Sequence, residues 1–258
     1  MPVAAPRTWT KGQITLAYAD EGAGPLIVAV HGVPGGRRDF RRLAAELTPG
    51  FRVVRLDLPG FGESPPAPAV DSPERAAACV VDLLADLGEP AILVGHSMGG
   101  VVALHTAIAA PARLRGLALL AAPGLRPHRI YFRRAAQVFS RLLRHDVVAR
   151  LLARPIAHVY ARAGLPTNTS PISRVLGIHY GAGLHFADQR RLVAQLRTPT
   201  LVAWADDDRL VEPEILAELA DACPPGPRLH FARAGHNLPG RVPAELAAAI
   251  AAWSPTLP

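Results

Sequence analysis

The sequence has few of the side chains that build disulfide frameworks or metal sites. Only 2 of its 258 residues are cysteine, and Cys79 and Cys223 lie far apart along the chain. Two distant thiols favour buried or incidental cysteines over a disulfide scaffold or a metal site. The chain also lacks the clustered Cys, His and Asp spacing typical of zinc sites and the glycine-rich lysine loop that binds phosphates. We therefore expect no metal ion and no cofactor.

Long apolar runs are missing as well, although 50% of the residues are hydrophobic. No run approaches the roughly 18 consecutive apolar residues that a membrane-spanning helix needs. The first residues, Met1–Arg7, lack the apolar centre of a signal peptide. These absences predict a cytoplasmic protein without a membrane span. The length suits one sizeable α/β domain with a buried sheet.

Lysine is nearly absent, because Lys11 is the only lysine. Nearly all the positive charge behind the net charge of +7 is therefore carried by arginine. Thirteen arginines but only two acidic residues, Asp146 and Asp188, lie between Leu125 and Thr198. An overall compositional preference for arginine and alanine is one explanation of this excess of arginine. Nucleic-acid binding is disfavoured, because only 5% of the residues are aromatic and no binding motif is present. If these arginines face a cleft, they would select a substrate that carries a carboxylate or phosphate.

The most informative segment present is a G-x-S-x-G pentapeptide, Gly95–Gly99, between the apolar run Ala91–Val94 and the helix-like run Val101–Ala107. This arrangement is the nucleophile-elbow signature. The serine sits on a sharp, strained turn, and glycines on either side avoid crowding it. Such a turn presents the Ser97 hydroxyl above a sheet and aims the Met98 N–H at any anion that forms nearby. An ordinary tight strand–helix turn is the alternative for the pentapeptide in isolation.

A second segment, His31–Gly35, follows the apolar run Leu26–Val30. An acyl-transfer enzyme needs a backbone N–H that pairs with the one at Met98 to bind an oxyanion. A loop that leaves an early buried strand can supply it, and we expect Val33 to be the donor. His31 is a candidate for substrate contact. A plain Pro-Gly turn is the structural alternative for this loop.

An acid and a base complete the set. The run Leu201–Asp208 is an apolar segment that ends in three aspartates. A carboxylate at a strand end can orient a histidine and stabilise the imidazolium that forms during turnover. His236 follows the short strand-like run Arg228–Phe231 and is the candidate base. The chain order Ser97, Asp208, His236 is the order expected of α/β-hydrolases.

Together these segments resemble the α/β-hydrolase superfamily, in the neighbourhood of serine esterases, haloperoxidase-like enzymes and C–C hydrolases. The resemblance covers nearly the whole chain and includes Asp57–Ser64, which is similar to the family's D-x-x-G-x-G-x-S loop. The family's acid strand usually ends G-x-x-D. Here Ala205 replaces the glycine, which places Asp208 in the acid position and leaves Asp207 as the alternative. The resemblance implies a Ser-Asp-His triad, an oxyanion hole and hydrolase activity.

Single residues separate the activities of this superfamily. Haloalkane dehalogenases and epoxide hydrolases use an aspartate nucleophile, whereas position 97 is serine. Hydroxynitrile lyases use a lysine near the site, and Lys11 is the only lysine here. A carboxylesterase that forms an acyl-enzyme with a small-molecule ester is favoured because it needs least beyond the triad. The alternatives are a C–C bond hydrolase, a lactonase or thioesterase, a cofactor-free perhydrolase and, from another class, a non-catalytic ligand-binding protein with this fold.

Short apolar runs alternate with helical patterns, which predicts a doubly covered, mostly parallel α/β sheet of about eight strands. Residues 9–20 are expected to form a hairpin. Further strands are expected at Leu26–Val30, Val53–Leu56, Ala91–Val94, Leu117–Leu120, Thr200–Trp204 and Arg228–Phe231. Helices are expected at Arg38–Leu47, Ser72–Leu87, Met98–Ala109, Glu214–Ala222 and Pro243–Trp253.

One insert interrupts this alternation, because helical periodicity replaces strand patterns between residues 125 and 196. Its expected helices are Ala135–Leu143, Val147–Leu152, Ile172–Ile178 and Asp188–Leu196. We expect residues 1–124 and 197–258 to form the α/β core and residues 125–196 to form a cap over the site. Packing between helices is the alternative for each aromatic candidate for the substrate pocket: Tyr131, Phe132, Phe139, Tyr160, Tyr180 and Phe186. The expected partner is a small ester-like molecule, and the expected assembly is a monomer or homodimer.

Overall fold

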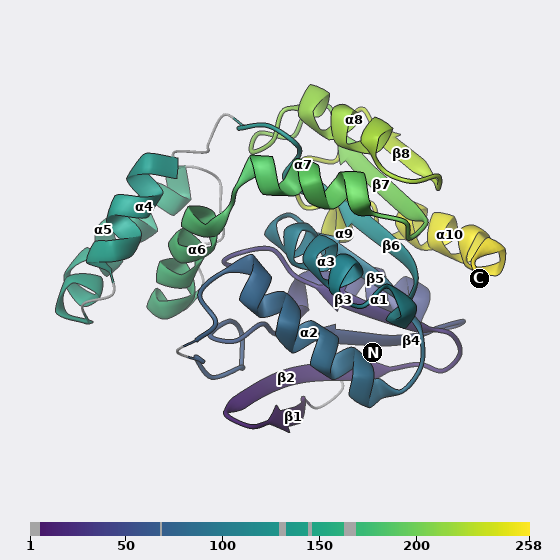
Figure 1. Ribbon diagram of the computed structural model, residues 1–258, viewed down its shortest axis with the longest axis horizontal. Helices are drawn as coiled ribbons and strands as arrows, with labels where there is room; N and C mark the ends of the chain where they lie inside the picture. Colours follow the sequence, from purple (N-terminus) through teal and green to yellow (C-terminus); the bar gives the residue numbers. More distant parts are fainter. Residues whose placement is uncertain (1–5, 68, 129–132, 144–145, 163–168) are drawn as a thin grey trace.

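Eight strands form one sheet at the centre of the molecule (Figure 1). The computed structural model describes residues 6–67, 69–128, 133–143, 146–162 and 169–258. The strands are β1 (Arg7–Lys11), β2 (Ile14–Glu21), β3 (Leu26–Val30), β4 (Arg52–Leu56), β5 (Ala91–His96), β6 (Leu114–Leu120), β7 (Thr200–Ala205) and β8 (Arg228–Phe231). They follow the order β1-β2-β4-β3-β5-β6-β7-β8, antiparallel at the β1–β2 and β2–β4 pairs and parallel elsewhere. The predicted mostly parallel α/β sheet of about eight strands is confirmed.

Helices cover both faces of this sheet. The core helices are α1 (Arg41–Leu47), α2 (Pro73–Leu87), α3 (Met98–Ala109), α8 (Pro213–Ala222), α9 (Leu238–Arg241) and α10 (Pro243–Trp253). Short 3-10 helices occupy Arg37–Phe40, Pro111–Arg113 and Ser254–Thr256. One apolar cluster joins a face of the sheet to α2, α3 and α8, and a second joins the opposite face to α1, α9 and α10. This doubly covered arrangement is what a parallel sheet requires.

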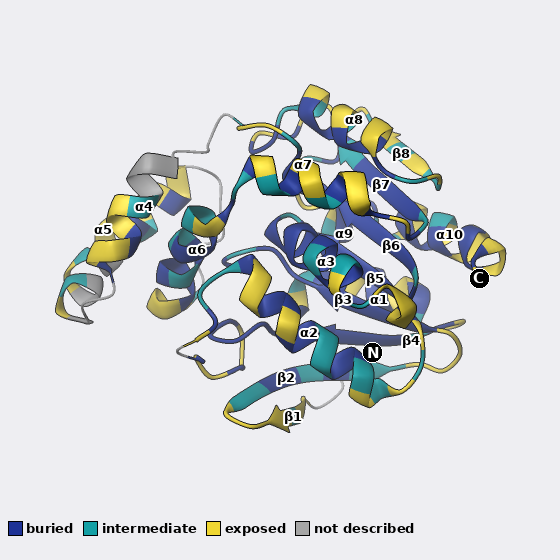
Figure 2. Cartoon of the chain, viewed as in Figure 1, coloured by how far each residue is buried: buried dark blue, intermediate teal, exposed yellow. Residues whose placement is uncertain are grey.

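The central strands are buried on both faces, which explains their continuous apolar sequences. All 5 residues of β3 are buried, and successive side chains point to opposite sides of the sheet. Leu26, Val28 and Val30 pack in the cluster that contains α2 and α3, whereas Ile27 and Ala29 pack in the cluster that contains α1 and α10. Figure 2 shows the central strands buried, whereas the edge strands β1 and β8 and parts of the outer helices are exposed. The buried central strands therefore support the loops at their carboxyl ends.

The bounds of α2 follow from its end residues. Ser72 is the N-cap, and its hydroxyl accepts a hydrogen bond from the Arg75 N–H at 3.3 Å. Pro73 occupies the first helical position, where no intrahelical N–H is needed. Gly88 ends the helix in the left-handed region at φ +79°. These end signals are local in sequence, so this helix was predictable with its bounds.

Between β6 and β7 the described residues form four further helices. These are α4 (Arg133–Leu142), α5 (Asp146–Arg162), α6 (Pro171–Gly183) and α7 (Phe186–Gln195). We call residues 125–196 the insert. None of its described residues belongs to a strand, in agreement with the sequence pattern. None of the described helices in the chain combines the length and the apolar character needed to cross a bilayer.

Helix α5 is longer than the predicted Val147–Leu152 segment because it continues through Pro155. A proline inside a helix lacks the N–H that would bond the carbonyl four residues earlier. That carbonyl belongs to Leu151, which is 73% exposed, so water can hydrate it. The proline therefore does not end the helix on this exposed face, and the sequence-based bound was wrong.

Helices α6 and α7 attach the insert to the core. The Ser173 hydroxyl of α6 donates to the Gly60 carbonyl at 3.0 Å. The Tyr180 ring packs edge-on against Phe61 with ring centroids 5.5 Å apart, and Val193 of α7 belongs to the main apolar cluster. Helices α4 and α5 both contact α6 and lie farther from the sheet (Figure 1). The insert is thus well packed at one end and peripheral at the other.

Candidate active site

Ser97 lies on a strained turn between β5 and α3. Its backbone has φ 53° and ψ −129°, a conformation that a residue with a side chain rarely adopts. The Ser97 N–H donates to the Leu120 carbonyl at 2.9 Å, and its carbonyl accepts from Gly100 N–H at 2.8 Å. A Cβ on Gly99 would collide with the backbone oxygens of Val30 and His31. The predicted elbow conformation therefore depends on glycine and is held by the neighbouring strand.

Three side chains from distant parts of the sequence meet at this turn. The Ser97 hydroxyl and His236 Nε2 are 2.8 Å apart. His236 Nδ1 and Asp208 Oδ2 are also 2.8 Å apart. In the neutral tautomer this geometry favours, the hydroxyl donates to Nε2 and Nδ1–H donates to the carboxylate. The structure brings the three residues into one hydrogen-bonded chain, with the Asp208 side chain fully buried.

The carboxylate of Asp208 is held in its ionised form. Burial alone would raise its pKa, but the hydrogen bond and charge of His236 and the backbone N–H groups of Leu210 and Val211 outweigh burial and hold the pKa below its ordinary value. Those N–H groups donate to Oδ1 at 2.8 and 3.1 Å, which leaves Oδ2 for the histidine. A fixed, charged acceptor at this position can orient an imidazole.

Asp207, the alternative acid, points elsewhere. Its Oδ1 accepts hydrogen bonds from the backbone N–H groups of Ala234 at 2.9 Å and Gly235 at 2.6 Å. These bonds lower its pKa and tie the end of β7 to the loop that carries His236. Asp208 therefore contacts the imidazole of His236, whereas Asp207 holds the backbone of the loop that precedes His236.

His96, the residue before Ser97, contacts the loop that carries His236. Its Nε2 is 2.8 Å from the His236 carbonyl oxygen, so Nε2–H donates and Nδ1 carries no proton. Nδ1 is buried and has no hydrogen-bond partner among the described residues. Burial, together with the neighbouring His236, lowers the pKa of His96 to about 3, which keeps the ring neutral. His96 is thus a fixed donor that positions the main chain of His236.

The loop after β3 brings backbone groups to the other side of Ser97. A Cβ on Gly32 would lie 2.8 Å from the Ser97 Cβ, so only glycine allows this approach. The Gly32 carbonyl accepts from Gly35 N–H at 2.8 Å, which closes the turn. The N–H groups of Val33 and Met98 have no hydrogen-bond acceptor among the described residues. Both donors lie next to residues that contact or carry the hydroxyl and are available to an oxygen atom of a ligand.

His31 supports this loop from within. Its side chain is fully buried, Nδ1 is 2.7 Å from the Gly32 carbonyl oxygen, and Nε2 accepts from Leu58 N–H at 3.0 Å. The ring also packs against Phe61 at a centroid distance of 5.4 Å. Because both ring nitrogens are engaged within the protein, this geometry suits positioning of the loop. It does not suit the substrate contact that we expected of His31.

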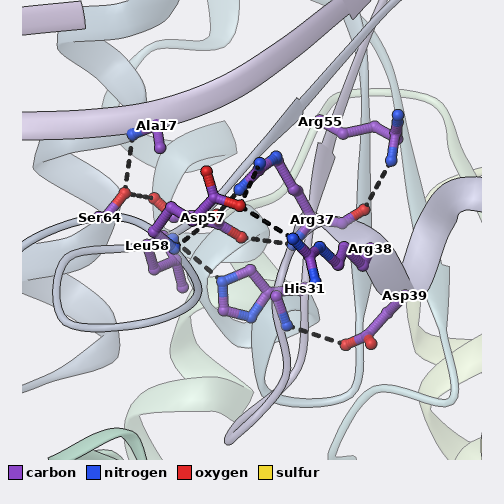
Figure 3. Close-up of polar contacts among 11 residues, drawn as sticks. Ala17, His31, Arg37, Arg38, Asp39, Arg55, Asp57, Leu58 and Ser64 are labelled. Carbon is purple, nitrogen blue, oxygen red and sulfur yellow. Dashed lines mark hydrogen bonds and ion pairs between the residues drawn. The ribbon is translucent and has the colours of Figure 1, made fainter. Parts of the chain in front are cut away.

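Asp57 lies behind the loop after β3 and holds it through hydrogen bonds (Figure 3). Its carboxylate accepts from the Arg37 backbone N–H at 2.6 Å, from the Arg37 guanidinium and from Glu63 N–H at 3.0 Å. Its own carbonyl accepts from the Ser64 hydroxyl at 2.6 Å, and that hydroxyl oxygen in turn accepts from Ala17 N–H at 2.8 Å. The D-x-x-G-x-G-x-S segment is therefore a buried brace between the sheet and the loop after β3.

The aromatic candidates of the insert have different surroundings. Tyr131 and Phe132 lie outside the described residues. Phe139 is 46% exposed, Tyr180 is fully buried against Phe61, and Tyr160 is buried with its hydroxyl donating to the Arg174 carbonyl at 3.0 Å. Packing within the protein explains Tyr160 and Tyr180. The remaining candidate, Phe186, is buried and packs edge-on against His128, with ring centroids 6.1 Å apart.

His128 was not singled out from the sequence. Burial lowers its pKa to about 4, and the charge of Glu212 opposes this shift. Among the described residues, no group of three or more His, Cys, Asp or Glu side chains is arranged to hold a metal ion. The chemistry available at this site is that of an activated hydroxyl, an imidazole, a carboxylate and two backbone donors.

Comparison with known proteins agrees with the fold. A family model described as the alpha/beta hydrolase fold matches residues 25–239. The chain belongs to the alpha/beta hydrolase family. It is 31% identical, over 83% of its own length and 88% of the relative's, to the pimeloyl-[acyl-carrier protein] methyl ester esterase of Chromobacterium violaceum. It also superposes on a thermophilic esterase from Thermogutta terrifontis, solved with malate bound, with a TM-score of 0.77, 27% identity and coverage of 98% and 99% of the two chains.

Some curated relatives of this alpha/beta hydrolase are longer proteins. The chain spans between 21% and 62% of the length of three of them. One is the bifunctional epoxide hydrolase 2 of Rattus norvegicus, 33% identical over 46% of this chain and 22% of the relative. Family membership is therefore established, and proteins named as esterases are among the relatives of this chain.

Proposed function

We propose that this alpha/beta hydrolase is a serine hydrolase that cleaves carboxylic esters of small molecules through an acyl-enzyme intermediate. The observation that carries the proposal is the hydrogen-bonded chain of Ser97, His236 and Asp208, whose two N···O distances are both 2.8 Å, at a strained turn. A serine hydroxyl is a weak nucleophile unless a base within hydrogen-bond distance removes its proton. The chain supplies that base and the carboxylate that orients it.

In the proposed first step, the Ser97 oxygen attacks the ester carbonyl carbon while His236 Nε2 takes its proton. The resulting oxyanion accepts hydrogen bonds from the N–H groups of Val33 and Met98. The tetrahedral intermediate then collapses, the carbon–oxygen bond to the alcohol breaks, and His236 returns the proton to the departing oxygen. The products of this step are the free alcohol and an acyl ester on Ser97.

In the proposed second step, water replaces the alcohol. His236 takes a proton from the water as its oxygen attacks the acyl carbon, and the same two N–H groups bind the second oxyanion. Collapse returns the proton to the Ser97 oxygen and releases the carboxylic acid. Asp208 remains ionised throughout and stabilises the imidazolium in both steps, which agrees with its lowered pKa.

The relatives support an ester substrate. Both the Chromobacterium protein and the Thermogutta protein are esterases by name. The epoxide hydrolase relative is a weaker guide, because the epoxide hydrolases that this chain resembles use an aspartate nucleophile and position 97 is serine. An ester is also the substrate that needs no residue beyond the triad and the two backbone donors.

We also propose that the insert acts as a cap over this site. Two contacts support it: Ser173 of α6 donates to the Gly60 carbonyl, and a Cβ on Gly177 of the same helix would lie 3.8 Å from the Val33 Cβ. A cap in this position excludes water from the reacting carbonyl and contributes contacts to the substrate. Residues 1–124 and 197–258 would then form the core that carries the chemistry.

A product-partition experiment tests the acyl-enzyme. Esters that share one acyl group but carry different alcohols are hydrolysed in the presence of hydroxylamine, and the ratio of hydroxamate to acid is measured. We expect one ratio for all alcohols, because every ester passes through the same acyl-Ser97. A ratio that changes with the alcohol would show that no common intermediate forms.

The nucleophile is tested separately with Ser97→Ala on p-nitrophenyl esters. Turnover is expected to fall by roughly 10⁴-fold or more, because the triad acts as a unit. The circular dichroism spectrum and the thermal midpoint serve as the folding control. A folded variant with near-full activity would rule out the proposed mechanism.

A further inference from the structure

The large apolar side chains that are exposed among the described residues are concentrated in one place. All of them lie on α4, α5 and α6: Val138, Phe139, Leu142, Val147, Leu151, Val159 and Ile172. We call these seven residues the apolar face. Soluble proteins bury most such side chains, and a concentration of exposed ones marks an interaction surface. The α/β core contributes none of them.

Helix α5 carries the most exposed part of the apolar face. Val147, Leu151 and Val159 are 69%, 73% and 63% exposed. They are separated by multiples of four residues and therefore follow one side of the helix. Ile156 and Tyr160 are buried, so the opposite side of α5 faces the protein. Helix α5 therefore differs from a simple amphipathic surface helix, because apolar residues occupy both its inner and its outer side.

The apolar face lies within the basic part of the molecule. Between residues 125 and 198 the chain has thirteen arginines and two acids, a formal charge of +11, whereas the rest has fifteen basic and nineteen acidic residues. Arg141, Arg154 and Arg162 are exposed on the same two helices as most of the apolar face. Apolar and cationic side chains are therefore interleaved on α4 and α5.

The combination of exposed apolar and cationic side chains favours one kind of partner over two others. A second copy of the chain would bring two segments of charge +11 together, and like charges oppose association. A short peptide is recognised in a groove or at a sheet edge, but these residues are exposed positions of helices, and Figure 2 shows exposed stretches along α4, α5 and α6. An anionic lipid bilayer accepts both kinds of side chain, since the apolar ones enter the acyl boundary and the guanidinium groups meet phosphates.

We propose that the outer surfaces of α4, α5 and α6 form a peripheral docking site for anionic lipid bilayers. Helices α4 and α5 lie at one end of the molecule and α10 at the other, so docking through α4 and α5 leaves most of the core clear of the bilayer (Figure 1). Helix α6 joins this surface to the candidate site through the bond from Ser173 to the Gly60 carbonyl. The docking proposal stands independently of the ester hydrolysis proposed above, because it uses no residue of the triad.

Vesicle co-sedimentation tests the proposal with the full chain. Vesicles of phosphatidylcholine with about one-third phosphatidylglycerol are compared with vesicles of phosphatidylcholine alone, at low and high salt. We expect binding to the anionic vesicles only, weakened at least tenfold by 0.5 M salt because surface charges are screened. Equal binding to both kinds of vesicle, or none to the anionic ones, would overturn the proposal.

Two variants and a matched control locate the surface. The triple variant Val147→Ser/Leu151→Ser/Val159→Ser and the double variant Arg154→Gln/Arg162→Gln are each expected to weaken vesicle binding about tenfold. Arg41→Gln/Arg113→Gln removes the same charge from exposed positions of the core and is expected to change binding less than twofold. Unchanged binding in the triple variant, or equal loss in the control, would contradict the proposed location.

Two further measurements keep these results interpretable. All substituted side chains are exposed, so circular dichroism and the thermal midpoint are expected to stay unchanged. Light scattering gives the mass in solution without vesicles. A dimer that dissociates in the triple variant would show that a second copy covers the apolar face. Binding to an acidic carrier protein in place of vesicles would show a protein partner. Either result would overturn bilayer docking.

Discussion

The α/β core and the helical insert of this member of the alpha/beta hydrolase family differ in charge and in the exposure of their large apolar side chains. The core has more acids than bases, buries its large apolar side chains and holds a serine in a strained conformation. The insert is strongly basic and carries every large apolar side chain that is exposed among the described residues. Strain of this kind persists only where the surroundings over-determine it. The contrast agrees with the two proposals above, in which the core carries the chemistry and the insert binds a bilayer.

The largest expected effect separates two adjacent aspartates of the core. Asp208→Asn should lower kcat about 10⁴-fold, because an amide cannot hold the His236 tautomer that accepts a proton. Asp207→Asn should lower kcat less than tenfold, since its amide oxygen can still accept the N–H groups of Ala234 and Gly235. Steady-state kinetics on one p-nitrophenyl ester gives both values. Equal losses in the two variants would contradict the assignment of the acid.

A pair of glycine substitutions compares packing in the two regions. Gly99→Ala should destabilise the protein by about 3 kcal/mol, because the new methyl group meets the backbone oxygens of Val30 and His31, which cannot move cheaply. Gly181→Ala in α6 should be neutral or stabilise by up to about 1 kcal/mol, since its Cβ would meet nothing within 4 Å. Urea unfolding measures both. A stable Gly99→Ala variant would show that the elbow is less constrained than the geometry indicates.

The pH dependence of stability tests the buried histidine of the core. The pKa of His96 is lowered to about 3 in the folded protein from an unfolded value near 6.5. Between these values the unfolded chain binds the proton and the folded protein does not, so stability falls as pH decreases. From pH 6.5 to pH 5 the loss should be about 2 kcal/mol, at about 1.4 kcal/mol per pH unit.

The variant His96→Gln removes this titration and should flatten the pH dependence over the same range. His105 and His128 also have lowered pKa values, so a smaller slope of the same sign should remain. Urea unfolding at pH 7, 6 and 5 measures the free energies. An unchanged slope in the variant would show that His96 is not the buried neutral group.

The smallest effect tests whether the two regions unfold separately. Tyr160→Phe removes the hydrogen bond from the hydroxyl to the Arg174 carbonyl, which should cost about 1 kcal/mol. Hydrogen exchange should show faster opening of α5 and α6 and unchanged protection of β3 and β5. Equal loss of protection in the sheet would show that insert and core unfold as one unit.

The sequence predicted the core better than the insert, for physical reasons. Met98–Ala109 and Pro243–Trp253 were predicted with their observed bounds. In the insert, α5 continues ten residues beyond the predicted end, through Pro155. Helices that are exposed on several sides follow the simple amphipathic pattern less closely, so periodicity locates them less well.

The catalytic candidates were predictable because the proposed chemistry requires particular residue types in a particular order along the chain. Ser97, Asp208 and His236 were selected by motif and chain order, and the structure brings them together. The positions of His96 and His31 could not be inferred, because their partners are backbone atoms. The carbonyl that His96 bonds lies 140 residues away, and no side-chain pattern encodes such a contact.

The most direct test of this account is covalent labelling of the folded protein with a fluorophosphonate probe. An activated serine attacks the phosphorus and expels fluoride, which leaves a stable adduct on its oxygen. Peptide mapping by mass spectrometry should place one adduct on Ser97, and labelling should be lost in Ser97→Ala and at least 100-fold slower in His236→Ala. Folded protein that takes up no probe, or that takes it up at another residue, would contradict the account.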